Sequence, residues 1–113
     1  MLARMEATAF AAEEAAQLLN LSRFLVGAGD PIRQQILMLL SRERLNVHNL
    51  AERIHLSRPA VSHHLKLLLD AELLVQERAG RERVYRVDAA RCRAFADELR
   101  AFIETCASGP ACR

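Results

Sequence analysis

The strongest constraint on the fold of this chain lies between residues 46 and 69, where two short segments of helical period are separated by a turn of only two residues. Asn46 is a favoured residue at a helix N-terminus, and Ser57, with Pro59 shortly after it, marks a second one. Apolar residues recur at steps of three or four in both segments: Val47, Leu50, Ala51 and Ile54 in the first, and Ala60, Val61, Leu65, Leu68 and Leu69 in the second. Two short helices joined by a tight turn form a helix-turn-helix.

The segments before this motif predict two further helices. Leu18, Leu21 and Leu25 recur at helical spacing, and the glycines at 27 and 29 are expected to stop this first helix. Asp30 followed by Pro31 is an N-cap with proline at the first helical position, which predicts a second helix up to about residue 41.

After the motif, the hydrophobic period changes to that of β-strands. Residues 74–87 predict a hairpin that turns at Gly80, because glycine adopts the positive φ of such turns at little cost. Asp88 caps a last helix, which Gly109 and Pro110 end. The predicted fold class is mainly α with a small β-hairpin, in the order α-α-α-α-β-β-α. It is a single winged helix-turn-helix domain over residues 1–113, with about twelve N-terminal and about six C-terminal residues expected to be disordered.

Length and composition narrow the classes of function. A chain of 113 residues is long enough for one domain with a core, and too short for a second, catalytic domain. It contains no run of about 18 apolar residues and no basic, apolar leader, so we expect a cytoplasmic protein without a membrane partner. No nucleophile has a base at motif spacing and no glycine-rich phosphate loop occurs, so an enzyme is not expected.

The distribution of charge indicates nucleic acid as the partner, although the net charge is only +2. Residues 53–69 contain three basic residues, three histidines and no acid, and the hairpin that follows is rich in arginine. Side chains on the outward face of the second motif helix have the reach to contact phosphates and base edges. The predicted DNA contacts are Ser57, Arg58, Ser62, His63, His64 and Lys66 from the helix-turn-helix, and Arg78, Arg81 and Arg83 from the wing. The alternative for the wing arginines is a merely solvated face.

Three stretches of the chain resemble the ArsR/SmtB family of dimeric metalloregulators. They are GDPIR at residues 29–33, LSRPAVSHHLKLL at 56–68 and AELLV at 71–75. The resemblance implies a homodimeric winged-helix repressor that binds double-stranded, palindromic operator DNA without a cofactor and leaves it when an inducer binds. It also implies that the first and last helices form the dimer interface. The residues that we expect there are Leu18, Leu21, Leu25, Phe95, Leu99 and Phe102.

The chain departs from this family at the known metal sites. Many members carry Cys-Val-Cys at the start of the third helix, where this chain has Asn46-Val47-His48, so His48 is expected to be a polar surface residue rather than a ligand. Other members bind zinc between their last helices through aspartate and histidine, but no histidine follows His64 here.

Three cysteines, an odd number in an expected cytosolic protein, remain as candidate effector ligands. Cys92 and Cys106 share one face of the last helix but lie roughly 21 Å apart along it, so they cannot join within one subunit. If two last helices cross antiparallel, Cys92 of one chain approaches Cys106 of the other, and Cys112 completes a three-thiol site. Such a site suits trivalent arsenic or antimony. The alternatives are an intersubunit disulfide or persulfide bridge, cysteines that serve only in packing, and a regulator without any effector. A winged-helix module that binds proteins without reading DNA is the alternative of a different class.

Overall fold

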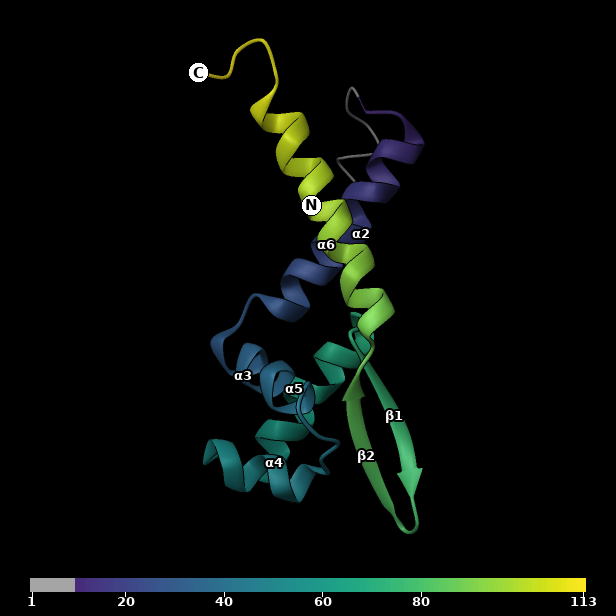
Figure 1. The fold of residues 1–113 in the computed structure, drawn as a ribbon, viewed down its shortest axis with the longest axis vertical. Coiled ribbons are helices and arrows are strands. Elements are labelled where there is room, and N and C mark those ends of the chain that lie inside the picture. Colours follow the sequence, from purple (N-terminus) through teal and green to yellow (C-terminus); the bar gives the residue numbers. More distant parts are fainter. Residues whose placement is uncertain (1–9) are drawn as a thin grey trace.

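The computed structural model describes residues 10–113 as five helices and one antiparallel hairpin (Figure 1). The elements are α2 (Ala12–Ala28), α3 (Pro31–Leu40), α4 (Val47–Ile54), α5 (Arg58–Asp70), β1 (Leu74–Ala79), β2 (Glu82–Val87) and α6 (Ala89–Ala107). This element order confirms the predicted winged helix-turn-helix. The expected N-terminal disorder falls mainly on residues 1–9, outside the described residues. The last residues of the chain form a turn in which the Cys112 N–H donates to the Gly109 carbonyl.

Side-chain caps begin four of these helices at the predicted residues. The Asp30 carboxylate accepts from the backbone N–H groups of Ile32 and Arg33, at 2.8 and 3.0 Å. Asn46 caps α4, Ser57 caps α5 and Asp88 caps α6 in the same manner. Because the first N–H groups of a helix have no partner within it, each cap defines where its helix begins.

The end of α2 differs from the prediction. Gly27 does not stop this helix but lies inside its last turn, fully enclosed, and Gly29 follows the last helical residue. A Cβ atom at position 27 would lie 2.6 Å from the Cβ of Ala71, at the end of α5. Gly27 therefore lies where α2 packs tightly against the end of α5, a role that helical periodicity does not show.

The core lies where α3, α4, α5 and the hairpin meet. The side chains with the least exposure are Ile36, Leu50, Val61, Leu65, Leu68 and Leu73. In the hairpin, Leu74 pairs with Val87 at the open end and Ala79 with Glu82 at the turn, where Gly80 has a φ of 65°. An additional bridge joins Leu45 to Tyr85 through two backbone hydrogen bonds of 3.0 and 3.4 Å. This bridge ties the wing to the segment before α4, and the sequence did not predict it.

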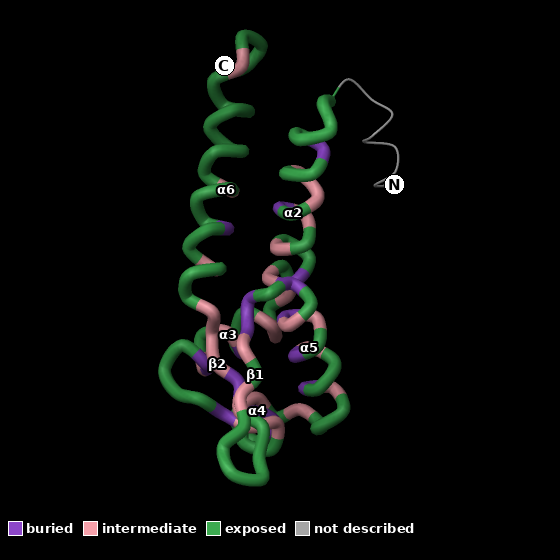
Figure 2. The backbone as a smooth tube through the Cα atoms, turned by 90° about the vertical axis from the view of Figure 1, so that its right-hand side faces the viewer, coloured by how far each residue is buried: buried purple, intermediate pink, exposed green. Residues whose placement is uncertain are grey.

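Helices α2 and α6 project together from this core (Figures 1 and 2). Near the core they pack through Phe24 and Phe95, whose rings stack with centroids 4.8 Å apart. Beyond this contact, α6 is exposed over most of its length (Figure 2), and the molecule measures 53 × 28 × 23 Å. Within residues 10–113, no helix is long and apolar enough to cross a membrane.

Candidate nucleic-acid interface

The outward face of α5 carries the polar side chains that the sequence predicted. Val61 and Leu65 are buried against the core, so the helix turns Arg58, Ser62 and Lys66 towards solvent. His63 is exposed on the same helix, and the Ser57 cap is exposed at its start. The face is uncovered and its side chains offer hydrogen-bond donors and acceptors, as contact with DNA requires.

His64 is placed differently from the prediction, because it turns inward. Its ring is half-buried, and Nδ1 lies 3.1 Å from a guanidinium nitrogen of Arg33, on α3. The same guanidinium donates to the carbonyls of Gly27 at 2.7 Å and Val26 at 3.0 Å, at the end of α2. His64 therefore belongs to a network that joins α2, α3 and α5, and its role as a DNA contact stays a prediction.

The Arg33 network also affects the carboxylate that caps α3. The backbone N–H of Arg33 donates to Asp30, and this hydrogen bond is the main reason that the pKa of Asp30 lies below its usual value. The charges of Arg33 and His64 act in the same direction, while partial burial opposes them. Asp30 is thus held ionised at the start of α3.

Arg58 makes a contact across the turn of the helix-turn-helix. Its Nη2 lies 2.5 Å from Nδ1 of His48, on the first turn of α4. Nε2 of His48 in turn lies 3.0 Å from a carboxylate oxygen of Glu52, one helical turn further along α4. The contact with Arg58 depends on how the two helices cross, which the sequence did not predict.

The wing presents arginines with and without carboxylate partners. Midway along the hairpin, Arg86 and Arg44 both bind Glu77, at 2.5 and 3.3 Å. The hydrogen bond from Arg86 is the main cause that lowers the pKa of Glu77. Arg78 and Arg83 are exposed, face each other directly across the two strands, and form no ion pair with any residue that the structure describes. Arg81, at the tip, is exposed in the same way.

The three cysteines separate into a pair and a single residue. Cys106 and Cys112 are exposed, and the Cys112 thiol donates to the Cys106 carbonyl, so the short tail folds back on the end of α6. Cys92 is half-buried at the other end of α6, and burial, followed by the charge of Asp88, raises its pKa. Among residues 10–113, no three potential ligands lie close enough within one chain to hold a metal ion.

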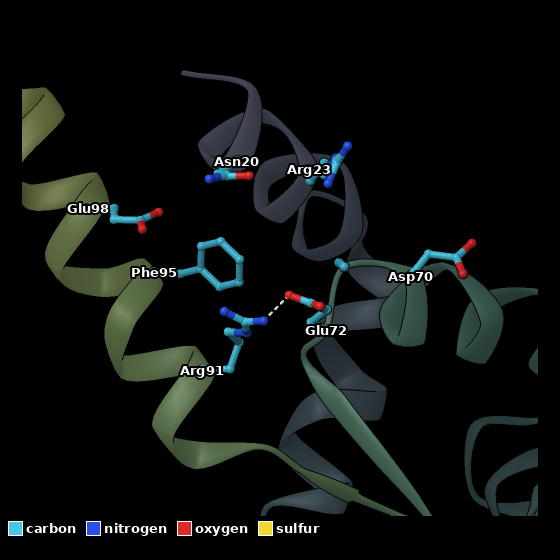
Figure 3. Close-up of a pocket in the computed structure, with 8 residues that line it drawn as sticks. Asn20, Arg23, Asp70, Glu72, Arg91, Phe95 and Glu98 are labelled. Atoms are coloured by element: carbon cyan, nitrogen blue, oxygen red, sulfur yellow. Dashed lines mark hydrogen bonds and ion pairs between the residues drawn. The ribbon is translucent and has the colours of Figure 1, made fainter. Parts of the chain in front are cut away.

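A cavity of about 270 Å³ lies between α2, the end of α5 and α6 (Figure 3). Arg91 binds Glu72 across one side of it, and Phe95 lies beside this ion pair (Figure 3). Glu72 has a φ of 62°, in the left-handed region. Arg23 and Glu98 also line the cavity, so its wall carries both signs of charge and favours no single class of ligand.

Comparison with known proteins identifies the family. The model for the arsR family of bacterial regulatory proteins matches residues 30–75, which include α3, the helix-turn-helix and the start of the wing. The arsenical resistance operon repressor of Staphylococcus aureus is 37% identical over 71 residues, which are 63% of this chain and 68% of that protein. The chain belongs to the ArsR family.

Two further comparisons define how far this kinship extends. The HTH-type transcriptional repressor SmtB of Mycobacterium tuberculosis is 40% identical over 57 residues, or 50% of this chain, but the match spans only 42% of that repressor's length. A solution structure from Mycobacterium bovis is described as a homodimeric winged helix-turn-helix DNA-binding domain and a possible ArsR-family transcriptional regulator. Its match to this chain has a TM-score of 0.69 at 24% identity, and it covers 86% of this chain and 91% of the M. bovis chain. This likeness shows the shared fold.

Within this ArsR-family fold, the six predicted interface residues have different positions. Leu21 and Phe95 are buried within the single chain, and Leu18 and Leu99 are half-buried. Leu25 and Phe102 remain 44% and 41% exposed. The sequence did not single out their neighbours, Val26 and Ile103, which are 65% and 51% exposed. These four exposed side chains lie on α2 and α6, the two elements that project from the core.

Proposed function

We propose that this ArsR-family protein is a homodimeric transcriptional repressor that binds a palindromic operator and is released by an effector at its C-terminal cysteines. The observation that carries the DNA-binding part is the pairing of Arg78 with Arg83 across the wing. Like charges directly opposite each other destabilise a hairpin. The repulsion between the two arginines destabilises the hairpin unless a polyanion neutralises their charges, and the phosphate backbone of DNA is such a polyanion.

The helix-turn-helix supplies the second part of the DNA interface. In this fold, the second helix of the motif enters the major groove, and its N-terminal residues reach the base edges. Here that helix is α5, with Ser57, Arg58 and Ser62 at or near its N-terminus and Lys66 further along. We assign base readout to the first turns of α5, and backbone contacts to Lys66 and the wing.

The dimer follows from the apolar side chains on the projecting helices. Leu25 and Val26 on α2, with Phe102 and Ile103 on α6, expose large apolar surfaces that the single chain leaves uncovered. The homodimeric state given for the M. bovis structure supports a second copy as the partner. Two copies related by a twofold axis place their recognition helices about one helical turn of DNA apart, which calls for a palindromic site.

The effector part rests on the thiols at the end of α6. Cys106 and Cys112 are exposed, and the Cys112 thiol donates to the backbone carbonyl of Cys106, so the tail brings a second thiol to the end of α6. Thiolates at this end are the ligands that a trivalent arsenic or antimony species would take. In an antiparallel dimer, Cys92 of the partner subunit supplies the third ligand. The arsenical resistance repressor of S. aureus makes the metalloid the first choice of effector, and thiol oxidation or persulfide formation at the same pair is the alternative.

The test begins with selection of duplexes from a random-sequence pool by the reduced wild-type protein. We expect enrichment of a palindromic site, with binding whose logarithm falls linearly with the logarithm of salt concentration. Arg83→Ala should weaken binding to selected and random duplexes alike and reduce the salt slope by about one unit. The matched control is Arg93→Ala, which removes an exposed arginine from α6. If the pool yields no preferred sequence, the repressor proposal is wrong, and a winged helix that binds proteins takes its place.

The effector is then identified on the selected duplex. Arsenite, antimonite, zinc and a persulfide donor are titrated against the complex, for the wild type and for serine variants of each cysteine. Release by arsenite or antimonite that is abolished by Cys106→Ser and Cys112→Ser supports the metalloid site. Release only by the persulfide donor supports the redox alternative. If no agent releases the DNA, these cysteines are not the sensor.

A further inference from the structure

Three side chains on the helix-turn-helix form a chain of contacts that the proposed function does not yet use. Arg58 is the first residue of α5, and His48 and Glu52 lie one turn apart on α4. His48 stands between the other two, with 2.5 Å from its Nδ1 to Nη2 of Arg58 and 3.0 Å from its Nε2 to Glu52. All three residues are exposed, on the part of the motif that carries the candidate DNA contacts.

The chemistry of these contacts determines which group donates. A guanidinium can only donate and a carboxylate can only accept, so Nδ1 of His48 accepts from Arg58 while its Nε2–H donates to Glu52. Both ring nitrogens are thereby used, and Glu52 selects the tautomer that can receive Arg58. The two nitrogens of His48 are therefore already engaged with protein groups.

The arrangement does little for the stability of the fold. The side chain of His48 is 50% exposed and that of Glu52 is 67% exposed, and polar pairs with this much solvent around them contribute little to folding. What the contacts do is restrict a long side chain. Arg58 has many rotamers when free, and a bound orientation reduces the conformational entropy that it loses on meeting a ligand.

The orientation leaves Arg58 able to bind. His48 takes one of the five N–H donors of the guanidinium, which leaves four for another partner. Two parallel donors of an arginine match O6 and N7 of guanine in the major groove. Arg58 lies at the N-terminus of the helix that enters this groove, where base contacts are made.

We infer that His48 and Glu52 are positioning residues that orient Arg58 to read one guanine in each operator half-site. This inference rests on the proposed DNA-binding function and deepens it. His48 does not contact the base. It acts through Arg58, so its effect on DNA binding should disappear when Arg58 is absent.

The experiment is a double-mutant cycle on the duplex that the wild-type protein selects from a random pool. Arg58→Ala should lower affinity by about 5- to 160-fold, with the loss confined to one base pair per half-site when single-base variants of the duplex are compared. His48→Ala should cause a smaller loss at the same base pair. In the Arg58→Ala background, His48→Ala should have no further effect. His48→Gln, which keeps one acceptor and one N–H donor, should retain most of the wild-type preference.

The control is a second cycle between His48 and Lys66, which lies eight residues further along α5. These two changes should multiply independently, because roughly 12 Å of helix separates Lys66 from Arg58. All of these positions are exposed, so thermal unfolding of each variant should match the wild type. Independent effects of His48→Ala and Arg58→Ala, or a changed preference at different base pairs, would overturn the inference while leaving DNA binding intact. A wild-type protein that selects no sequence would overturn both.

Discussion

Gly27 offers the sharpest test of how this fold is held together. A Cβ atom at this position would lie 2.6 Å from the Cβ of Ala71, whereas carbon atoms in contact prefer roughly 3.5–4.0 Å. Both atoms are attached directly to the backbone, so no side-chain rotation can separate them. Gly27→Ala therefore requires α2 to move away from α5 by about 1 Å.

Two effects of opposite sign decide the magnitude. Alanine inside a helix is more favourable than glycine by roughly 0.5–1 kcal/mol. Overpacking costs roughly 1–3 kcal/mol, and the upper part of that range applies here because the clash is between backbone-linked atoms. The clash is the larger effect. We expect Gly27→Ala to lower the free energy of unfolding by about 2 kcal/mol, which corresponds to a fall in melting temperature of roughly 10 °C.

The compensating change is Ala71→Gly, which removes the atom that Gly27→Ala would meet. Alone, it should cost up to about 1 kcal/mol through the added flexibility of glycine. Together, the two changes should recover most of the loss, so that the double variant is more stable than Gly27→Ala. Urea unfolding followed by circular dichroism at one fixed protomer concentration measures all four proteins, because a dimer's stability depends on concentration.

The matched control is Gly109→Ala, at the end of α6, where the nearest atom to an added Cβ is 3.6 Å away. This change should alter stability by less than about 0.5 kcal/mol. If Gly27→Ala is as stable as the wild type, or if Ala71→Gly fails to rescue it, then the packing of α2 on α5 does not limit this position and the reasoning is refuted.

Three further predictions concern single side chains. Because the native pKa of Asp30 is depressed, its carboxylate stabilises the fold above roughly pH 4, and this contribution is lost as the pH falls through the native pKa. In urea unfolding at a series of pH values, Asp30→Asn should therefore reduce the loss of stability at acid pH, and an unchanged pH dependence would contradict the prediction. The raised pKa of Cys92 predicts slower alkylation by iodoacetamide near neutral pH than at the exposed Cys106 and Cys112, as peptide mass spectrometry would show, and equal rates would refute this. Glu72→Gly removes left-handed strain of roughly 1–2 kcal/mol together with an exposed ion pair, whereas Glu72→Ala removes only the ion pair. The glycine variant should therefore unfold at the higher urea concentration, and the reverse order would exclude strain at this position.

The elements of this fold are largely encoded by local chemistry. Asp30, Asn46, Ser57 and Asp88 each cap a helix at the residue that the sequence predicts, because a cap acts within three residues of its own position. The hairpin likewise turns at Gly80, where a positive φ is required. The helical period also predicts the outward face of α5, because the buried residues of that helix determine which of its side chains face solvent.

Contacts between elements were not accessible in this way. The usual role of glycine predicts a helix stop at Gly27, but its actual role depends on Ala71, at the end of α5. The basic, acid-free segment predicts His64 as a DNA contact, whereas the crossing of α3 and α5 brings it to Arg33. The bridge from the wing to Leu45 depends in the same way on where the hairpin docks.

The sequence by itself therefore determined the order and the type of the elements and the start of each capped helix, along with the family, because caps, turns and hydrophobic periods act over a few neighbouring residues. Tertiary structure alone decided which polar side chains are exposed without a protein partner and which contact another residue. Arg58 meets His48 ten residues away, and the three cysteines divide into Cys92 and the Cys106–Cys112 pair, because these contacts depend on the angles at which helices cross and on the path of the tail. A pattern with a period of a few residues carries no information about such angles.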